Sequence, residues 1–98
     1  MSVTISFHQL AELELKEAAL YYNSEVPGLG NTFLGEVEHT LDQITQYPSS
    51  APPVLGVVRR KLVRRFPYSV LYSFENDTVR ILAIANQKRR PFYWRLRR

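Results

Sequence analysis

The chain has no cysteine among its 98 residues, which excludes disulfide bonds and thiol catalysis and fits a reducing cytoplasm. It also lacks long apolar runs, and its first residues contain neither a basic segment nor a long apolar one. The sequence therefore predicts no membrane span and no secretion signal. Glycine is scarce as well, and the close pair Gly28 and Gly30 lacks the third glycine and the preceding strand that a nucleotide-binding loop needs.

Only two histidines are present, His8 and His39, and both fall among helical residues, where we interpret them as surface or helix-edge side chains. The carboxylates Glu12, Glu14 and Glu17 have no cysteine or closely spaced histidine beside them, and carboxylates on an amphipathic helix are usually solvated. The sequence therefore predicts no metal site and no cofactor.

The charges that are present divide the chain into two halves of opposite sign. Residues 1–57 hold one Lys and seven acidic residues, which gives −6, and residues 58–98 hold twelve Lys and Arg and two acidic residues, which gives +10. A one-sided excess of this size attracts polyanions or an acidic partner. We therefore expect the basic half to carry the function.

The hydrophobic fraction is 45% and the charged fraction 22%, as in ordinary globular proteins. At this length the chain can bury one core, so residues 1–98 are expected to form a single domain. Alternation in residues 2–7 predicts a half-buried strand. A helical period follows from about His8 to about Ser24. Its apolar stripe consists of Ala11, Leu15, Ala18 and Tyr22, widened by Leu13 and Leu20.

Residues 26–30 contain one proline and two glycines, which end a helix, and Asn31 is a candidate cap for the next helix. The second helical stripe ends at Tyr47 and Pro48. Because the turn is short, the two helices are expected to form an antiparallel pair. Residues 49–53 are interpreted as a connector, since two prolines do not suit a central strand.

The remainder of the chain has the pattern of β-structure. Alternation predicts strands over residues 58–66, 68–74 and 79–85, and the four polar residues 75–78 have the usual length of a hairpin connection. In the last strand, Val79, Ile81, Ala83 and Ala85 are expected to share one face. The sequence thus predicts an α+β domain of order β-α-α-β-β-β. Its mostly antiparallel sheet would carry the helix pair on one face and the arginines on the other, with a short C-terminal tail or helix.

Two stretches are more specific than this order of elements: residues 65–72 (RFPYSVLY) and 81–94 (ILAIANQKRRPFYW). Together with residues 17–22, residues 28–33 and the pair Arg59 and Arg60, they resemble the toxins of the RelE/ParE superfamily over nearly the whole chain. The resemblance implies the toxin of a type II toxin–antitoxin system, held in a hetero-oligomer by a cognate antitoxin whose flexible C-terminal segment wraps it. Members of this superfamily either cut messenger RNA on the ribosome or poison DNA gyrase, and the shared fold does not choose between them.

For the nuclease activity, the resemblance implies Tyr93 as the functional tyrosine, because it stands where RelE-like nucleases keep one. RNA cleavage also needs cations to stabilise the phosphorane. These would be supplied, if the protein is a nuclease, by Arg60, Lys61 and Arg89.

Three departures from the nuclease pattern count against this activity. Ser69 and Gln87 stand where those nucleases have arginines, and neither side chain can hold a phosphate as a fixed cation. Asn86 stands where many relatives carry histidine, and it has no useful pKa near neutrality.

A binding role is therefore considered for the basic residues together with one aromatic residue. Four arginines within seven residues repel one another unless an anion compensates their charge. The alternative to a binding role is that they form a solvated face of a strand. Trp94 either anchors the C-terminal tail or stacks on a base or a partner. The candidate binding residues are Arg59, Arg60, Arg64, Arg65, Lys88, Arg89, Arg90 and Trp94.

Three hypotheses follow from the sequence. The first is a ParE-like toxin that inhibits DNA gyrase by binding, and the missing nuclease cations slightly favour it. The second is a metal-independent, ribosome-dependent endoribonuclease, which Tyr93 and the basic strands favour. The third is an inactive homologue that only binds its antitoxin. All three predict a cytoplasmic protein without a membrane partner.

Overall fold

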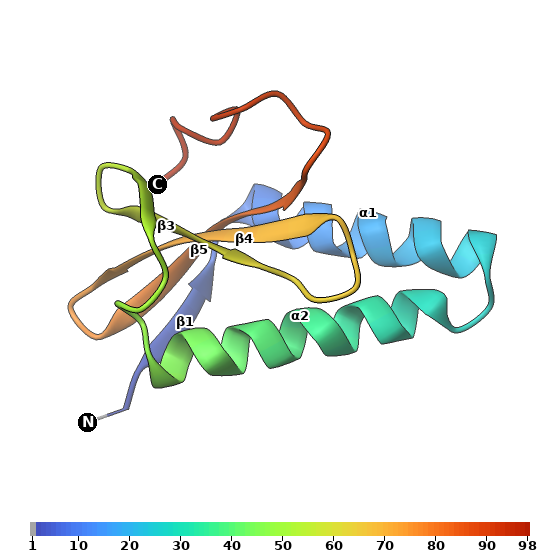
Figure 1. The fold of residues 1–98 in the computed structure, drawn as a ribbon, viewed down its shortest axis with the longest axis horizontal. Coiled ribbons are helices and arrows are strands. Elements are labelled where there is room, and N and C mark those ends of the chain that lie inside the picture. Colours follow the sequence, from blue (N-terminus) through green and yellow to red (C-terminus); the bar gives the residue numbers. More distant parts are fainter. Residues whose placement is uncertain (1) are drawn as a thin grey trace.

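The computed structural model describes residues 2–98, so Met1, the first residue of the expected domain, lies outside the described residues. Two helices follow a first strand, and the other strands come after them (Figure 1). This confirms the α+β class and the predicted order, with one additional short strand. The elements are β1 (Thr4–Phe7), α1 (Gln9–Glu25), α2 (Leu29–Gln46), β2 (Pro53–Leu55), β3 (Val58–Leu62), β4 (Tyr68–Glu75) and β5 (Thr78–Asn86).

The two helices form the predicted antiparallel pair and begin with different caps (Figure 1). His8 caps α1, because its Nδ1 accepts a hydrogen bond from the Leu10 backbone N–H at 3.0 Å. For α2 the predicted cap Asn31 is wrong, since Gly28 holds the N-cap position. Its φ of 87° lies in the left-handed region, which glycine adopts without the steric cost of a Cβ.

Gly30 sets how closely α2 approaches α1. A Cβ at this position would collide with the carbonyl oxygen of Ala19, and the Gly30 N–H donates to Asn23 Oδ1 at 2.7 Å. The tight turn between the helices therefore depends on two glycines for two reasons, backbone conformation at Gly28 and space at Gly30.

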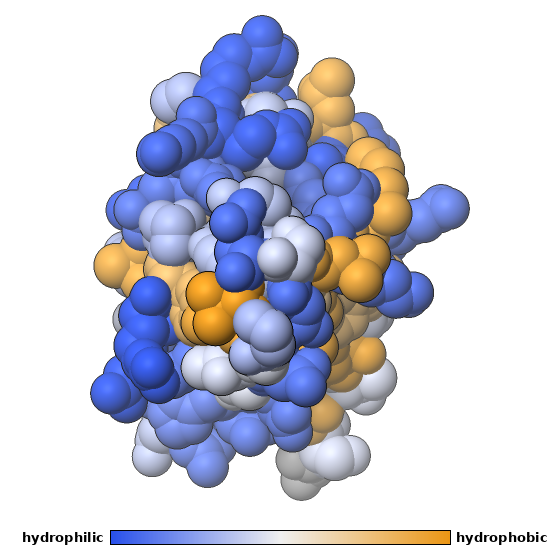
Figure 2. Space-filling model, turned by 90° about the vertical axis from the view of Figure 1, so that its right-hand side faces the viewer, coloured by the Kyte–Doolittle hydropathy of each residue, from blue (hydrophilic) through white to orange (hydrophobic). Residues whose placement is uncertain are grey.

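The buried face of α1 follows the predicted spacing but is narrower than predicted: Leu15 and Tyr22 pack partly buried against the core, as expected. Ala11, Ala18 and Ala19 are buried, whereas Leu13 and Leu20 are 49% and 70% exposed, so their assignment to the stripe was wrong. Small residues face the neighbouring elements because α1 lies close to both α2 and β5. Figure 2 shows exposed apolar groups on both sides and near the centre of the face that it draws, between hydrophilic residues. Within residues 2–98, neither helix is long and apolar enough to cross a membrane.

The sheet has five strands in the order β1-β5-β4-β3-β2. Pairing is antiparallel between β5 and β4, between β4 and β3, and between β3 and β2. β1 pairs parallel with β5. The sheet is therefore mixed and mostly antiparallel, as predicted. The predicted connector was partly wrong, because residues 53–55 form β2. Proline is accommodated there because β2 is an edge strand and Pro53 is its first residue.

A bulge in β5 breaks the predicted alternation of its side chains. Leu71 pairs with Ala83 and Tyr72 pairs with Ile81, which leaves Leu82 as an extra residue. Val79 and Ile81 therefore belong to the core beside the helices, whereas Ala83 and Ala85 belong to a second cluster. The prediction that these four residues share one face was wrong for this reason.

The second cluster lies on the sheet face opposite the helices, and residues 87–98, called here the C-terminal segment, cover part of that face (Figure 1). The segment is a tail of consecutive turns, in which backbone N–H groups donate to carbonyls three residues earlier, as from Arg97 to Trp94. Trp94 packs in the cluster with Leu71 and Ala85. The sequence predicted that the arginines would occupy this face. The structure shows that an apolar cluster also lies on it.

Candidate functional site

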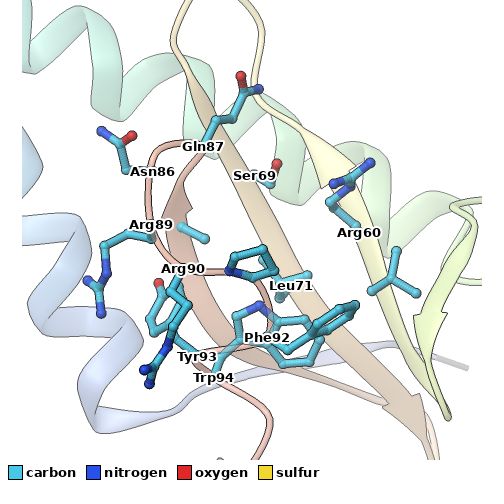
Figure 3. Close-up of a pocket in the computed structure, with 13 residues that line it drawn as sticks. Arg60, Ser69, Leu71, Asn86, Gln87, Arg89, Arg90, Phe92, Tyr93 and Trp94 are labelled. Carbon is cyan, nitrogen blue, oxygen red and sulfur yellow. The ribbon is translucent and has the colours of Figure 1, made fainter.

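A pocket of about 380 Å³ lies between the sheet and the C-terminal segment and is called here the sheet pocket (Figure 3). β2, β3, β4, the end of β5 and the C-terminal segment supply its walls. It is lined by Val54, Arg60, Ser69, Leu71, Ala85, Asn86, Gln87, Arg89, Arg90, Pro91, Phe92, Tyr93 and Trp94.

The register of the sheet explains why these residues meet. Arg60 pairs with Leu71 across β3 and β4, and Ser69 pairs with Ala85 across β4 and β5. Alternate residues of a strand share a face, so Arg60, Ser69 and Leu71 face the same side. Ala85 faces the same side because it pairs directly with Ser69, and it lies beneath the C-terminal segment.

The floor of the sheet pocket is apolar and its rim is cationic. Leu71 and Trp94 are buried, and Phe92 is 43% exposed with its ring centroid 5.8 Å from that of Trp94. Figure 3 shows Arg60 on one side of the pocket and Arg89 on the other. The guanidinium carbon of Arg89 lies 3.8 Å from the centre of the Tyr93 ring, a cation–π contact that fixes it on this side.

Glu14 of α1 joins the C-terminal segment to the sheet. Its carboxylate accepts hydrogen bonds from the Tyr93 hydroxyl at 2.8 Å and from Arg97 Nη1 and Nη2 at 2.9 and 3.1 Å. Arg89 Nη1 lies 3.9 Å from the same carboxylate. Glu14 is therefore not one of the solvated carboxylates that the sequence suggested, because its side chain is only 15% exposed.

The same carboxylate also closes an open edge of the sheet. β1 ends at Phe7, opposite Ile81, so beyond that point β5 has no neighbouring strand on the edge that faces β1. There Glu14 accepts a hydrogen bond from the Ile84 N–H at 3.1 Å, and Arg97 donates to the Leu82 carbonyl at 3.0 Å. A paired acid and base thus satisfy backbone groups that another strand would otherwise satisfy.

These contacts determine the chemistry available to Tyr93. Burial raises the pKa of the Tyr93 hydroxyl above its ordinary value, and the hydrogen bond to the Glu14 carboxylate raises the pKa further. The hydroxyl therefore keeps its proton to higher pH than an ordinary tyrosine does, and this proton is directed at Glu14. A general base needs a free lone pair and a pKa near the working pH, and Tyr93 lacks the second.

Of the residues predicted to be functional, five line the sheet pocket: Arg60, Arg89, Arg90, Tyr93 and Trp94. Lys61 pairs with Val70, whose side chain lies in the core beside the helices, so Lys61 points away from the pocket. Lys88 lines a second cavity of about 350 Å³ between α1 and the end of β5, which also contains Tyr21.

Three of the predicted arginines lie elsewhere. Arg59 Nη1 donates to the carbonyls of Ser49 and Ala51, at 3.0 and 2.6 Å, and so holds the connector before β2. Arg65 Nη1 lies 3.6 Å from Oε2 of Glu36 in α2. Arg64 is exposed in the loop between β3 and β4, outside the sheet pocket.

Sequence reasoning missed Glu14 and Phe92 as site residues. Glu14 lies three residues after Ala11 and four before Ala18, on the same face of the helix, and both alanines are buried. This spacing was the one sequence pattern that could have distinguished Glu14 from the solvated carboxylates near it. Within residues 2–98, His, Asp and Glu side chains nowhere gather in threes that could hold a metal ion.

Comparisons with known proteins place the chain in a family. The family model described as "ParE toxin of type II toxin-antitoxin system, parDE" matches residues 5–91. A comparison with curated proteins found no match. The fold is similar to a solved structure described as "Chromosomal ParDE TA system from P. aeruginosa", with 16% identity, a TM-score of 0.76, and coverage of 87% of this chain and 96% of that chain. From the family match over most of its length, the chain belongs to the ParE toxins of type II toxin–antitoxin systems.

Proposed function

We propose that this toxin acts in the cytoplasm by binding DNA gyrase and blocking its reaction, without cutting RNA itself. The observation that carries the proposal is the state of Tyr93, whose hydroxyl is hydrogen-bonded to Glu14 and has a raised pKa. A ribonuclease that uses this tyrosine needs its hydroxyl free to exchange a proton with the substrate.

The remaining wall of the sheet pocket supports the same proposal. Ser69, Asn86 and Gln87 line it, and none of these three side chains exchanges a proton near neutral pH. Arg60 and Arg89 supply positive charge, but positive charge alone binds a phosphate without activating the 2′-hydroxyl. The pocket therefore suits recognition better than cleavage.

A cellular experiment tests the proposal. The chain is induced in a bacterium that lacks the antitoxin, and RNA 5′ ends and the DNA-damage response are recorded within minutes in the same cultures. We expect growth arrest with DNA damage and with messages intact inside their coding regions. The control culture also expresses the cognate antitoxin, and it should grow normally.

New RNA ends inside translated codons would overturn the proposal in favour of the ribosome-dependent nuclease. Normal growth with neither response would instead indicate an inactive homologue that only binds its antitoxin.

A further inference from the structure

The end of the helix pair, residues 20–30, is called here the helix tip. The two helices extend past the sheet, so the helix tip stands apart from the strands (Figure 1). Three large side chains on it remain in solvent, because Leu20, Tyr21 and Val26 are 70%, 58% and 52% exposed. Figure 2 faces this end of the molecule and shows apolar groups near its centre. Apolar groups that gather on an exposed surface mark sites of interaction.

Hydrogen bonds hold the backbone of the helix tip in one conformation. Asn23 Oδ1 accepts a hydrogen bond from the Gly30 N–H at 2.7 Å. The Val26 N–H donates to the Tyr22 carbonyl at 3.0 Å and so closes the last turn of α1. A surface whose conformation is already fixed loses little conformational entropy when it binds. The exposed apolar side chains are therefore preorganised for contact with a partner.

The charge around the helix tip is negative. Residues 17–58 contain no Lys or Arg, and the exposed residues Glu17 and Glu25 flank the apolar side chains. In the part of the chain that the structure describes, neither carboxylate forms an ion pair. Lys88 shares the second cavity with Tyr21 and marks the limit of the acidic surface on that side. The helix tip thus has the opposite charge to the rim of the sheet pocket and attracts a cationic partner.

Two other kinds of occupant do not suit this charge. A nucleic acid presents phosphates, which the two glutamates repel. A second copy of this chain, docked tip to tip about a twofold axis, would place the same glutamates against each other. The partner therefore needs an apolar groove that is bordered by lysines or arginines.

We propose that the helix tip docks on DNA gyrase, in an apolar groove beside the cationic surface along which that enzyme holds DNA. Any enzyme that binds DNA needs Lys and Arg side chains opposite the phosphates. Such a surface complements Glu17 and Glu25, and the apolar side chains of the helix tip supply the hydrophobic contact. This inference rests on gyrase as the proposed target and adds the surface of the toxin that recognises it.

Inhibition of gyrase by purified toxin variants tests the docking surface. Val26→Lys places a cation in the apolar part of the helix tip, and Glu25→Lys reverses a charge at its edge. Two matched controls make the same changes elsewhere. Val57→Lys alters a valine that is 62% exposed in the turn between β2 and β3, and Glu38→Lys alters an exposed glutamate further along α2. All four positions are exposed, and circular dichroism checks the fold of each variant.

The measurement is the toxin concentration that halves DNA supercoiling by gyrase. We expect each tip variant to require about tenfold more toxin than the wild type, or beyond, and each control less than about threefold more. The reason is that contacts at the centre of an interface contribute more binding energy than screened charges at the surface. Equal inhibition by the tip variants and their controls would overturn the docking surface.

The wild-type chain separates this inference from the proposed function. If the wild type inhibits gyrase and the tip variants do so equally, the docking surface fails and the gyrase target stands. If the wild type does not inhibit gyrase, the target fails and the docking surface fails with it. Analytical ultracentrifugation tests for a second copy as the occupant, and wild-type dimers that Val26→Lys dissociates would also overturn the proposal.

Discussion

The Tyr93 hydroxyl illustrates how a residue's surroundings decide its role. In the sequence, Tyr93 matches the functional tyrosine of the related nucleases, and it does line the sheet pocket. Its hydroxyl, however, donates to Glu14, and its ring lies beneath the guanidinium group of Arg89. The aromatic residue thus binds the C-terminal segment to α1, a role that no local pattern in the sequence indicates.

The raised pKa of Tyr93 predicts a loss of stability in alkaline solution. Tyrosine ionises near its ordinary pKa of 10.0 in the unfolded chain, while the folded chain keeps the proton to higher pH. The stability that comes from this difference is complete below pH 10.0 and is lost as the pH rises from there toward the folded pKa. The free energy of unfolding should therefore fall with pH in this range.

The measurement is urea unfolding of the wild type and of Tyr93→Phe between about pH 8 and pH 11. The fall should be shallower for the variant. The difference between the two slopes should stay below roughly 1.4 kcal/mol per pH unit, the limit for a difference of one bound proton between the folded and unfolded states. Burial also raises the pKa of Tyr22 and Tyr72, so the variant should still lose some stability. Parallel curves for the two proteins would show that Tyr93 contributes nothing to this dependence.

At the scale of elements, the Glu14 carboxylate connects α1, β5 and the C-terminal segment. Glu14 and Arg97 are 15% and 12% exposed, and together they satisfy the Ile84 N–H and the Leu82 carbonyl. Removing one member of a buried ion pair leaves the other uncompensated, which costs about 3 kcal/mol or more. The segment that covers the sheet pocket therefore depends on one acidic residue of a distant helix.

Glu14→Ala should lower the free energy of unfolding by about 3 kcal/mol and should speed hydrogen exchange in residues 87–98. Glu17→Ala removes a carboxylate from an exposed residue of the same helix and should change stability by less than about 0.5 kcal/mol. Chemical denaturation and exchange mass spectrometry measure both effects. Equal stabilities for the two variants would contradict the role of Glu14.

The elements themselves follow largely from periodicity and turn chemistry. Proline and glycine after residue 25 end α1, and apolar alternation indicates β3, β4 and β5. The side-chain faces of β5 could not be predicted, because the bulge at Leu82 arises from pairing with β4. The role of Glu14 could not be predicted either, since its partners lie some seventy residues or more along the chain.

At the scale of the whole molecule, the separation of charge along the sequence is only partly preserved in space. Two of its acidic residues pair across the halves, Glu14 with Arg97 and Arg89, and Glu36 with Arg65. Arg60 and Arg90 remain at the sheet pocket, on the face opposite the helices. Two arginines without an ion pair thus lie beside an apolar cavity, which the sum of charges alone does not reveal.

The central claim, that this ParE-family toxin binds gyrase and does not use Tyr93 as a catalyst, is tested most directly with purified components. The measurement is DNA supercoiling by gyrase in the presence of the wild-type chain or of Tyr93→Phe, checked for fold, with RNA cleavage on translating ribosomes followed in parallel. We expect both proteins to inhibit supercoiling to a similar degree and neither to cut RNA. Undisturbed supercoiling, together with RNA cleavage that Tyr93→Phe abolishes, would contradict it.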